Sequence, residues 1–368
     1  MSLREFGRMN DHRVEEITLR NAAGAEAKII TFGAVVRDLR VPLADGTMQR
    51  VVLGLETLED YLNHSPHFGA IAGRYANRIG GGRFLLDGKA YQLPLNQENR
   101  HSLHGGGQGF GKKLWTLLHY DAASVTLGLV SPDGDANYPG TLNVTCRYTL
   151  FEENALRIEL SAFTDAPTII NLCHHSYFNL DGSPDILDHA LMVRANVMTP
   201  VDGDLIPDGS MLPVSGTPFD FRRPRAVRLA NEDGSRFWYD HNFVLRREKR
   251  EPPVGGLELA HAATLASEKS GLQMEVWTTE PCLQVYDGFK VNLPVRGLGS
   301  EKSSKVDTGL REDFSSPYGP AHYGANAGIC LEPQHAPDSP NLPHMPSTVL
   351  RPGELYRQVT EYRFGGAR

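Results

Sequence analysis

Hydrophobic and polar residues alternate with a period of two over much of the chain. From Leu142 to Leu150 every even-numbered residue is apolar and every odd-numbered residue is polar. After a polar turn at 152–154, the apolar residues again fall on even numbers, from 156 to 162. Because successive side chains of a strand point to opposite faces, the two segments predict an antiparallel hairpin with one buried face.

Further segments carry a strand signal. Residues 272–276 alternate in the same way, and residues 84–86 and 89–93 flank Asp87-Gly88. This dipeptide tolerates the positive φ angles of a type I′ turn, so we predict a second hairpin there. Helical periodicity is limited to a short candidate at 55–62.

Turn-forming residues recur along the whole chain, which has 37 glycines and 24 prolines. Short strands separated by regular turn signals predict an all-β fold, a large sandwich or barrel. No linker, low-complexity stretch or internal repeat divides the chain, so we expect one domain over residues 1–368. The irregular segment 294–327, rich in Gly, Ser, Pro and charge, predicts a long surface loop.

The charge distribution narrows the range of partners. The net charge is −7, and the 37 basic residues are scattered rather than gathered into a run. This argues against nucleic acid or an anionic membrane and favours a neutral or polar small molecule. The apolar runs are far shorter than the ~18 residues that a membrane-spanning helix needs.

Cysteine usage and the first residues bear on location. The four cysteines stand far apart without a C-x-x-C pair, and MSLREFGRMNDHR carries charge where a signal peptide needs an apolar stretch. We therefore expect a soluble, cytoplasmic protein with reduced thiols.

Ionisable and amide side chains gather at five places beside glycine or aromatic residues. These are Asn77-Arg78 in GRYANRIGGGRF, His104 in HSLHGGGQGFGKKLW, His174-His175 in HHSYFNLDG, Asp240 in WYDHNF and Glu332 in CLEPQHAPDSPN. Each of these residues alone also fits an ordinary role as a turn, cap, core or surface ion-pair residue.

Three common site chemistries fit the spacing of these residues poorly. His101 and His104 precede two glycines and lack the i,i+4 helical spacing of a zinc protease, and the chain has no H-x-H element. Ser176 lies in a strand-like HSYFNL run rather than in a G-x-S-x-G elbow. The glycine-rich stretches do not match a phosphate-binding loop. We therefore predict no metal site.

Taken together, ordered blocks of sequence make the chain similar to the aldose 1-epimerase (galactose mutarotase) family from near its start to its end. The blocks are GRYANRIGGGRFLLDGKAYQLPLN, SLHGGGQGFGKKLW, HSYFNLDG, TPVDGDLIPDGS with GTPFDFR, YDHNF, EPCLQVYDG and CLEPQHAPDSPNLP. The resemblance implies a β-supersandwich with an open carbohydrate-binding cleft on one sheet. It also implies a mutarotase, an isomerase that interconverts the anomers of a free aldohexose such as galactose or glucose.

Carried over position by position, the resemblance implies that Glu332 is the general base and His175 the general acid. Arg78, His104 and Asp240 would then hold the sugar.

Four more residues are placed by the same comparison and by strand geometry. Asn77 and Gln284 would complete the polar shell of the cleft. If their segments are strands, His174 and His241 point away from the cleft and stay outside the site.

The chemistry of anomer exchange explains this choice of groups. A base removes the proton of the C1 hydroxyl while an acid protonates the ring oxygen O5, and reclosure after rotation gives the other anomer. This requires an ionised Glu332 and a protonated His175, whose pKa a neighbouring carboxylate such as Asp240 would raise. No cofactor is expected, because the reaction already proceeds in water. The expected partner is a monosaccharide, and the protein is expected to be a monomer or homodimer.

The chain departs from the family pattern in three places. His101 stands where an Asn is common, and Cys173-His174 replaces small or amide residues before HSYFNL. The connection 293–327 is longer than usual, and we hypothesise that it forms part of the cleft rim.

Three other functions are compatible with parts of this pattern. A hexose 6-phosphate epimerase would need an added basic cluster, which the sequence does not reveal. A non-catalytic sugar-binding protein would have no need of a matched acid and base. A glycoside hydrolase would need two carboxylates across the bond, for instance Asp240 and Glu332.

Overall fold

The alternating segments form long antiparallel hairpins in the computed structural model. β13 (Leu142–Leu150) pairs with β14 (Ala155–Thr164), and Leu150 lies opposite Leu156. The apolar residues of β13 are buried, whereas the polar residues between them are half-buried or exposed. The predicted hairpin is confirmed, because one face of each strand packs on the core.

The second predicted hairpin is also confirmed. β8 (Arg83–Leu86) pairs with β9 (Lys89–Gln92), and the turn residues Asp87 and Gly88 have φ angles of 50° and 78°. Both angles lie in the left-handed region that a type I′ turn requires.

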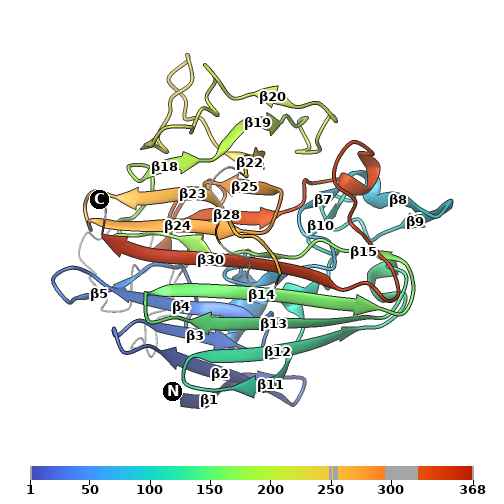
Figure 1. The fold of residues 1–368 in the computed structure, drawn as a ribbon, viewed down its shortest axis with the longest axis horizontal. Coiled ribbons are helices and arrows are strands. Elements are labelled where there is room, and N and C mark those ends of the chain that lie inside the picture. Colours follow the sequence, from blue (N-terminus) through green and yellow to red (C-terminus); the bar gives the residue numbers. More distant parts are fainter. Residues whose placement is uncertain (1, 248–250, 252–255, 295–321, 367–368) are drawn as a thin grey trace, which may run out of the picture.

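Three large antiparallel sheets build the part of the chain that the structure describes, which is residues 2–247, 251, 256–294 and 322–366. The first is a meander of β1 (Ser2–Met9), β2 (His12–Arg20), β3 (Glu26–Ile30), β4 (Val35–Pro42) and β5 (Met48–Arg50). The second has the order β11 (Thr116–Tyr120), β12 (Ser124–Ser131), β13, β14, β30 (Tyr356–Gly366), β24 (Leu272–Thr278), β23 (Ala260–Ser267), β18 (Ala190–Val193) and β21 (Arg225–Ala226). The third has the order β17 (Tyr177–Phe178), β28 (Ile329–Gln334), β25 (Cys282–Tyr286), β22 (Asp240–Leu245), β19 (Ala195–Thr199) and β20 (Leu212–Pro213). Figure 1 shows β30, near the C-terminus, lying between β14 and β24.

Short ladders, one α-helix and four 3₁₀ helices of three residues each complete the described elements. The ladders are β6 (Ile71–Ala72) with β16 (Cys173–His174), β7 (Arg78–Ile79) with β10 (Ser102–Leu103), β15 (Thr168–Ile169) with β29 (Val349–Leu350), and β26 (Leu293–Pro294) with β27 (His322–Tyr323). The helix predicted at 55–62 is found as α1 (Leu58–His64), and it starts where the Thr57 hydroxyl accepts a hydrogen bond from the Asp60 N–H. None of the described helices is long and apolar enough to cross a membrane.

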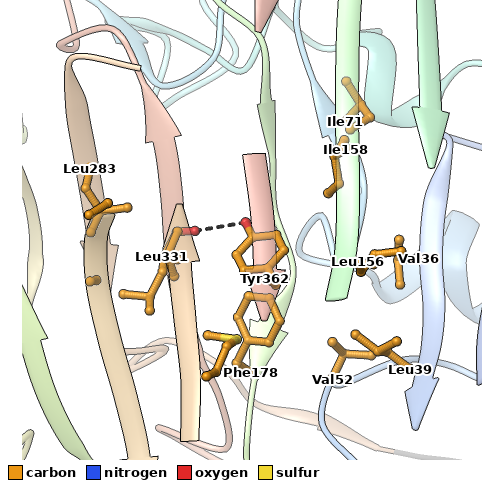
Figure 2. Packing of buried hydrophobic residues seen from close by; sticks show 14 of the residues in the cluster. Val36, Leu39, Val52, Ile71, Leu156, Ile158, Phe178, Leu283, Leu331 and Tyr362 are labelled. Carbon is orange, nitrogen blue, oxygen red and sulfur yellow. Dashed lines mark hydrogen bonds between the residues drawn. The ribbon is translucent and has the colours of Figure 1, made fainter. Parts of the chain in front are cut away.

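The nine-stranded sheet packs against both other sheets (Figure 2). Leu156 of β14 faces Val36 of β4, and Tyr362 of β30 lies beside Phe178 and Leu331 of the six-stranded sheet. The Tyr362 hydroxyl donates a hydrogen bond of 3.1 Å to the carbonyl of Leu331, so a buried polar group is satisfied across the interface. The architecture confirms the predicted all-β sandwich.

The structure does not test the predicted domain boundaries or the predicted surface loop at 294–327. One buried cluster takes side chains from all three large sheets, which supports a single domain without testing the boundaries 1–368. Of the segment 294–327, residues 295–321 lie outside the described part of the chain, so the surface loop and its place at the rim are not tested.

Candidate active site

The six-stranded sheet brings polar side chains from three strands onto one face. Glu332 of β28 lies opposite Gln284 of β25, and Tyr286 of β25 lies opposite Asp240 of β22. Residues two apart on a strand share a face, so these four side chains point to the same side. The intervening residues, such as Leu283, pack in the core on the other face.

His175 reaches this face from the connection between β16 and β17. Its N–H donates to the carbonyl of Ala70 (2.9 Å), and its carbonyl accepts from the N–H of Gly69 (3.0 Å). Gly69 has a φ of +65°, and a Cβ there would lie 2.1 Å from the carbonyl oxygen of Val36, so only glycine fits. This anchoring places His175 Nε2 3.6 Å from Glu332 Oε2. The predicted acid and base therefore converge.

The turn residues at the end of the β7–β10 ladder hold the imidazole of His104 in place. Asn77 and His104 both have positive φ, 61° and 51°. The Asn77 N–H donates to His104 Nδ1 (3.2 Å), and the His104 N–H donates to the Asn77 carbonyl (3.1 Å). Because Nδ1 accepts, the neutral ring carries its hydrogen on Nε2 and can donate from that side.

Asp240 is held between two donors. Gln284 Nε2 donates to Asp240 Oδ1 at 2.6 Å, and Arg78 Nη2 lies 3.5 Å from Asp240 Oδ2. Arg78 in turn donates from Nε to Gln97 Oε1 at 2.9 Å. The guanidinium and the carboxylate are thereby fixed as a donor and an acceptor beside Glu332 and His175.

These side chains surround a cavity of about 270 Å³. Six of the seven predicted residues line it: Asn77, Arg78, His104, His175, Asp240 and Glu332. Gln284 does not line the cavity and touches it only through its hydrogen bond to Asp240.

The two histidines left out of the site lie outside the cavity, as predicted. His174 Nε2 hydrogen-bonds to the Ser176 hydroxyl (2.7 Å). The His241 ring packs on Phe219, with ring centroids 4.5 Å apart.

His67 also lines the cavity, although no sequence motif predicted it. Its ring centroid lies 4.7 Å from that of His104 and 5.8 Å from that of His175. Among the described residues its ring nitrogens have no hydrogen-bond partner, and its φ of 69° is unusual for a non-glycine residue. In the sequence His67 stands in HSPHFG, where no motif distinguishes it from other histidines such as His64.

Two buried thiols contact Glu332 and His175. Cys173 Sγ lies 3.4 Å from Glu332 Oε2, and Cys330 Sγ lies 3.5 Å from His175 Nδ1. Potential ligand atoms of His175, Cys330 and Glu332 lie within 4.8 Å of one another. The thiol faces Nδ1 whereas the carboxylate faces Nε2, so one imidazole nitrogen does not serve both neighbours, which is unfavourable for a shared metal ion.

Burial dominates the electrostatics of the pair. Desolvation, helped by the charge of Asp240, raises the pKa of Glu332 to about 8. Desolvation, helped by His67, lowers the pKa of His175 to about 3. The predicted upward shift of the His175 pKa is therefore wrong, because burial outweighs any carboxylate. At neutral pH the pair holds one proton, and Glu332 carries it.

Comparisons with known proteins show the family of this chain. The sequence profile of a family described as aldose 1-epimerase matches residues 15–363. The chain belongs to the aldose 1-epimerase family. The galactose mutarotase of Rattus norvegicus is 40% identical over 356 residues, which cover 96% of this chain and 95% of that protein. The aldose 1-epimerase of Escherichia coli K12 is 36% identical over 356 residues, covering 95% of this chain and 94% of that protein.

Solved structures of aldose 1-epimerase relatives share the fold. A GalM/aldose epimerase homologue from C. elegans superposes with a TM-score of 0.83 and 28% identity, covering 96% of this chain and 99% of that one. A galactose 1-epimerase from Lactobacillus acidophilus gives a TM-score of 0.77 and 28% identity, covering 100% and 99%. The predicted family, isomerase class and β-supersandwich are confirmed.

Proposed function

We propose that the protein interconverts the α and β anomers of a free aldohexose, galactose or glucose, with Glu332 and His175 as its acid–base pair. The observation that supports this most is the 3.6 Å contact between the two side chains at the wall of a cavity. The cavity volume, about 270 Å³, lies near the lower limit of ~300 Å³ for small-molecule sites, which favours one sugar ring over a longer saccharide.

Ring opening uses the single proton of the pair. Ionised Glu332 takes the proton of the C1 hydroxyl, protonated His175 gives a proton to O5, and the C1–O5 bond breaks as the aldehyde forms. For this, the resting proton moves from Glu332 Oε2 to His175 Nε2, directly or through a sugar hydroxyl. After rotation about C1–C2 the steps run backwards, and the pair ends with the one proton it began with.

The low pKa of His175 favours an alternative assignment of the same two groups. Neutral His175 would accept the C1 proton while protonated Glu332 donates to O5, with the same proton balance. A crystal structure with bound galactose separates the two: O1 beside Glu332 supports Glu332 as the base, and O5 beside Glu332 supports the alternative.

The surrounding groups hold the sugar. His104 Nε2 and the Arg78 guanidinium donate to ring or hydroxyl oxygens, and Asp240 accepts from a hydroxyl. Gln284 orients Asp240, and the main chain of Asn77 fixes the ring of His104, so these two act through their neighbours.

Polarimetry with freshly dissolved α-galactose tests the proposal. We expect equilibration much faster than the uncatalysed rate, and no nitrophenol release from a nitrophenyl galactoside. Sugar binding without rate enhancement would indicate a binding protein, and nitrophenol release would indicate a hydrolase; either result would contradict the proposal.

We also infer a cytoplasmic location. All four cysteines are buried and free, which fits a reducing compartment. Assembly as a monomer or homodimer stays a prediction.

A further inference from the structure

Cys173 is a buried residue of β16 whose thiol faces Glu332. Its Sγ lies 3.4 Å from Glu332 Oε2, and both residues are at most 2% exposed. Cys173 does not line the cavity, so any influence on a bound sugar has to pass through Glu332. Cys173 is also one of the positions where the sequence departs from the family pattern.

A short ladder and small neighbours fix the position of this thiol. Cys173 lies opposite Ala72 of β6, and it packs with Ala72 and Ala76 in a buried cluster. The two alanines carry no polar side-chain atom, so they offer the thiol no competing acceptor. Within the described part of the chain, the thiol's hydrogen bond goes to the Glu332 carboxyl group.

The thiol is the donor when Glu332 is ionised. Burial, helped by the charge of Glu332, raises the pKa of Cys173 well above its usual value, so the sulfur keeps its hydrogen at neutral pH. A thiol is a weak donor, but a hydrogen bond to a buried carboxylate stabilises the charged form. Among the described residues, no other group donates a hydrogen bond to the Glu332 side chain.

The two oxygens of Glu332 have different surroundings. Cys173 Sγ and His175 Nε2 both face Oε2, at 3.4 and 3.6 Å. Oε1 has no hydrogen-bond partner in the described part of the chain, and Glu332 lines the cavity. The carboxyl group is therefore oriented with Oε1 available to a substrate hydroxyl.

We propose that Cys173 is a positioning residue for Glu332, which holds the carboxyl group through Oε2 and favours its ionised form. This role rests on the proposed function, because both assignments of acid and base need an ionised Glu332 at one stage of ring opening. A variant without the thiol should therefore have a less oriented carboxyl group that ionises less readily.

The other groups around Glu332 set the background for this effect. Desolvation, the largest influence, and the charge of Asp240 raise the pKa of Glu332, whereas the Cys173 hydrogen bond and the charge of Arg78 lower it. A substitution of Cys173 leaves these other influences in place. It also leaves the remaining titratable neighbours, which are His175, Cys330, Tyr177 and Tyr362.

Titration of Glu332 in Cys173 variants tests this role. ¹³C NMR of the full chain with carboxyl-labelled glutamate follows the ionisation, and Glu332→Gln identifies the signal. We expect Cys173→Ala to raise the titration midpoint by about half to one pH unit, the effect of one weak hydrogen bond to a charged group. Cys173→Ser keeps a hydroxyl donor and should restore most of the difference. Cys146→Ala is the matched control, since this equally buried thiol lies on β13 in the core and should leave the midpoint unchanged.

Polarimetry separates positioning from a merely structural role. A midpoint higher by this amount makes ionised Glu332 about three- to tenfold rarer, so kcat of Cys173→Ala at pH 6 should fall by that factor while KM changes less than about twofold. Cys173→Ser should recover most of the turnover.

Three results would overturn the proposal. These are an unchanged or lower midpoint in Cys173→Ala, equal midpoints in Cys173→Ala and Cys173→Ser, and a wild-type kcat in Cys173→Ala. The titration requires no turnover, so it tests the hydrogen bond even if the wild-type protein proves not to be a mutarotase.

Discussion

Glu332 and His175 are two buried side chains that share one proton. The pKa of Glu332 is raised to about 8 and that of His175 is lowered to about 3. Between these values the pair holds one proton, whichever atom carries it. Ring opening needs one donor and one acceptor, so we propose that the state with one proton is the active state.

The pH dependence of kcat/KM follows from that proton count. Above pH 8 the pair loses its only proton and has no acid; below pH 3 both groups are protonated and there is no base. We therefore expect a level profile from about pH 4 to 7 and a fall of about tenfold per pH unit above about 8. Polarimetry with subtraction of the uncatalysed rate measures it. A catalytic rate that rises through pH 8 would contradict a shared proton.

His67 is a further residue of the cavity lining whose role can be tested by substitution. Burial and the charge of Lys112 lower its pKa to about 4, so its ring is neutral at pH 7. Its nitrogens have no partner within the described part of the chain, so a sugar hydroxyl is the expected partner. One lost hydrogen bond of ~0.5–1.5 kcal/mol predicts that His67→Phe raises KM about three- to tenfold with a smaller effect on kcat. His64→Phe, at an exposed position outside the cavity, is the control. An unchanged KM in His67→Phe would remove His67 from the site.

Five residues of the candidate site could be predicted from the sequence, because each stands in a distinctive block. They are Arg78, His104, His175, Asp240 and Glu332. Their protonation states could not be predicted, since pKa shifts depend on burial. His67 was missed for a related reason: only the fold brings this isolated histidine beside two others.

At the scale of elements, β22, β25 and β28 present the site from one face, and short irregular connections supply the remaining groups. The long hairpin β13–β14 was predictable because alternation over residues 142–150 and 156–162 leaves a clear period. The two-residue strands β7 and β10, which position Arg78 and His104, are too short to show any period.

Gly105, directly after His104, lies where the backbone leaves no room for a side chain. Gly105 has a φ of +85°, and a Cβ there would lie 1.9 Å from the carbonyl oxygen of Gly73. We expect Gly105→Ala to lower the free energy of unfolding by more than about 2 kcal/mol and to reduce turnover, because His104 is displaced. Gly107→Ala is the control, since a Cβ there meets no atom within 4 Å. Chemical denaturation of both variants measures the difference, and equal stabilities would refute the packing argument.

At the scale of the whole molecule, the three large sheets share one buried cluster. The all-β class was predictable from alternation and turns. The sheet order was not, because alternation says which face is buried but not which strand is the neighbour. The insertion of β30 between β14 and β24 is the clearest example, since it joins strands far apart in sequence.

A shared core predicts cooperative unfolding. We expect one calorimetric transition whose van't Hoff and calorimetric enthalpies agree, with coincident near- and far-ultraviolet circular dichroism. Tyr362→Phe removes the hydroxyl bond between β30 and β28 and should lower the stability by about 1 kcal/mol without splitting the transition. Two separated transitions in the wild-type protein would contradict a single domain.

Turnover of Glu332→Gln tests the central claim most directly, because glutamine keeps the shape of the side chain but cannot exchange a proton. With fresh α-galactose in the polarimeter, kcat should fall at least ~100-fold while the affinity for the sugar, measured by calorimetry, changes little. Turnover near that of the wild type would show that Glu332 is not part of the acid–base pair.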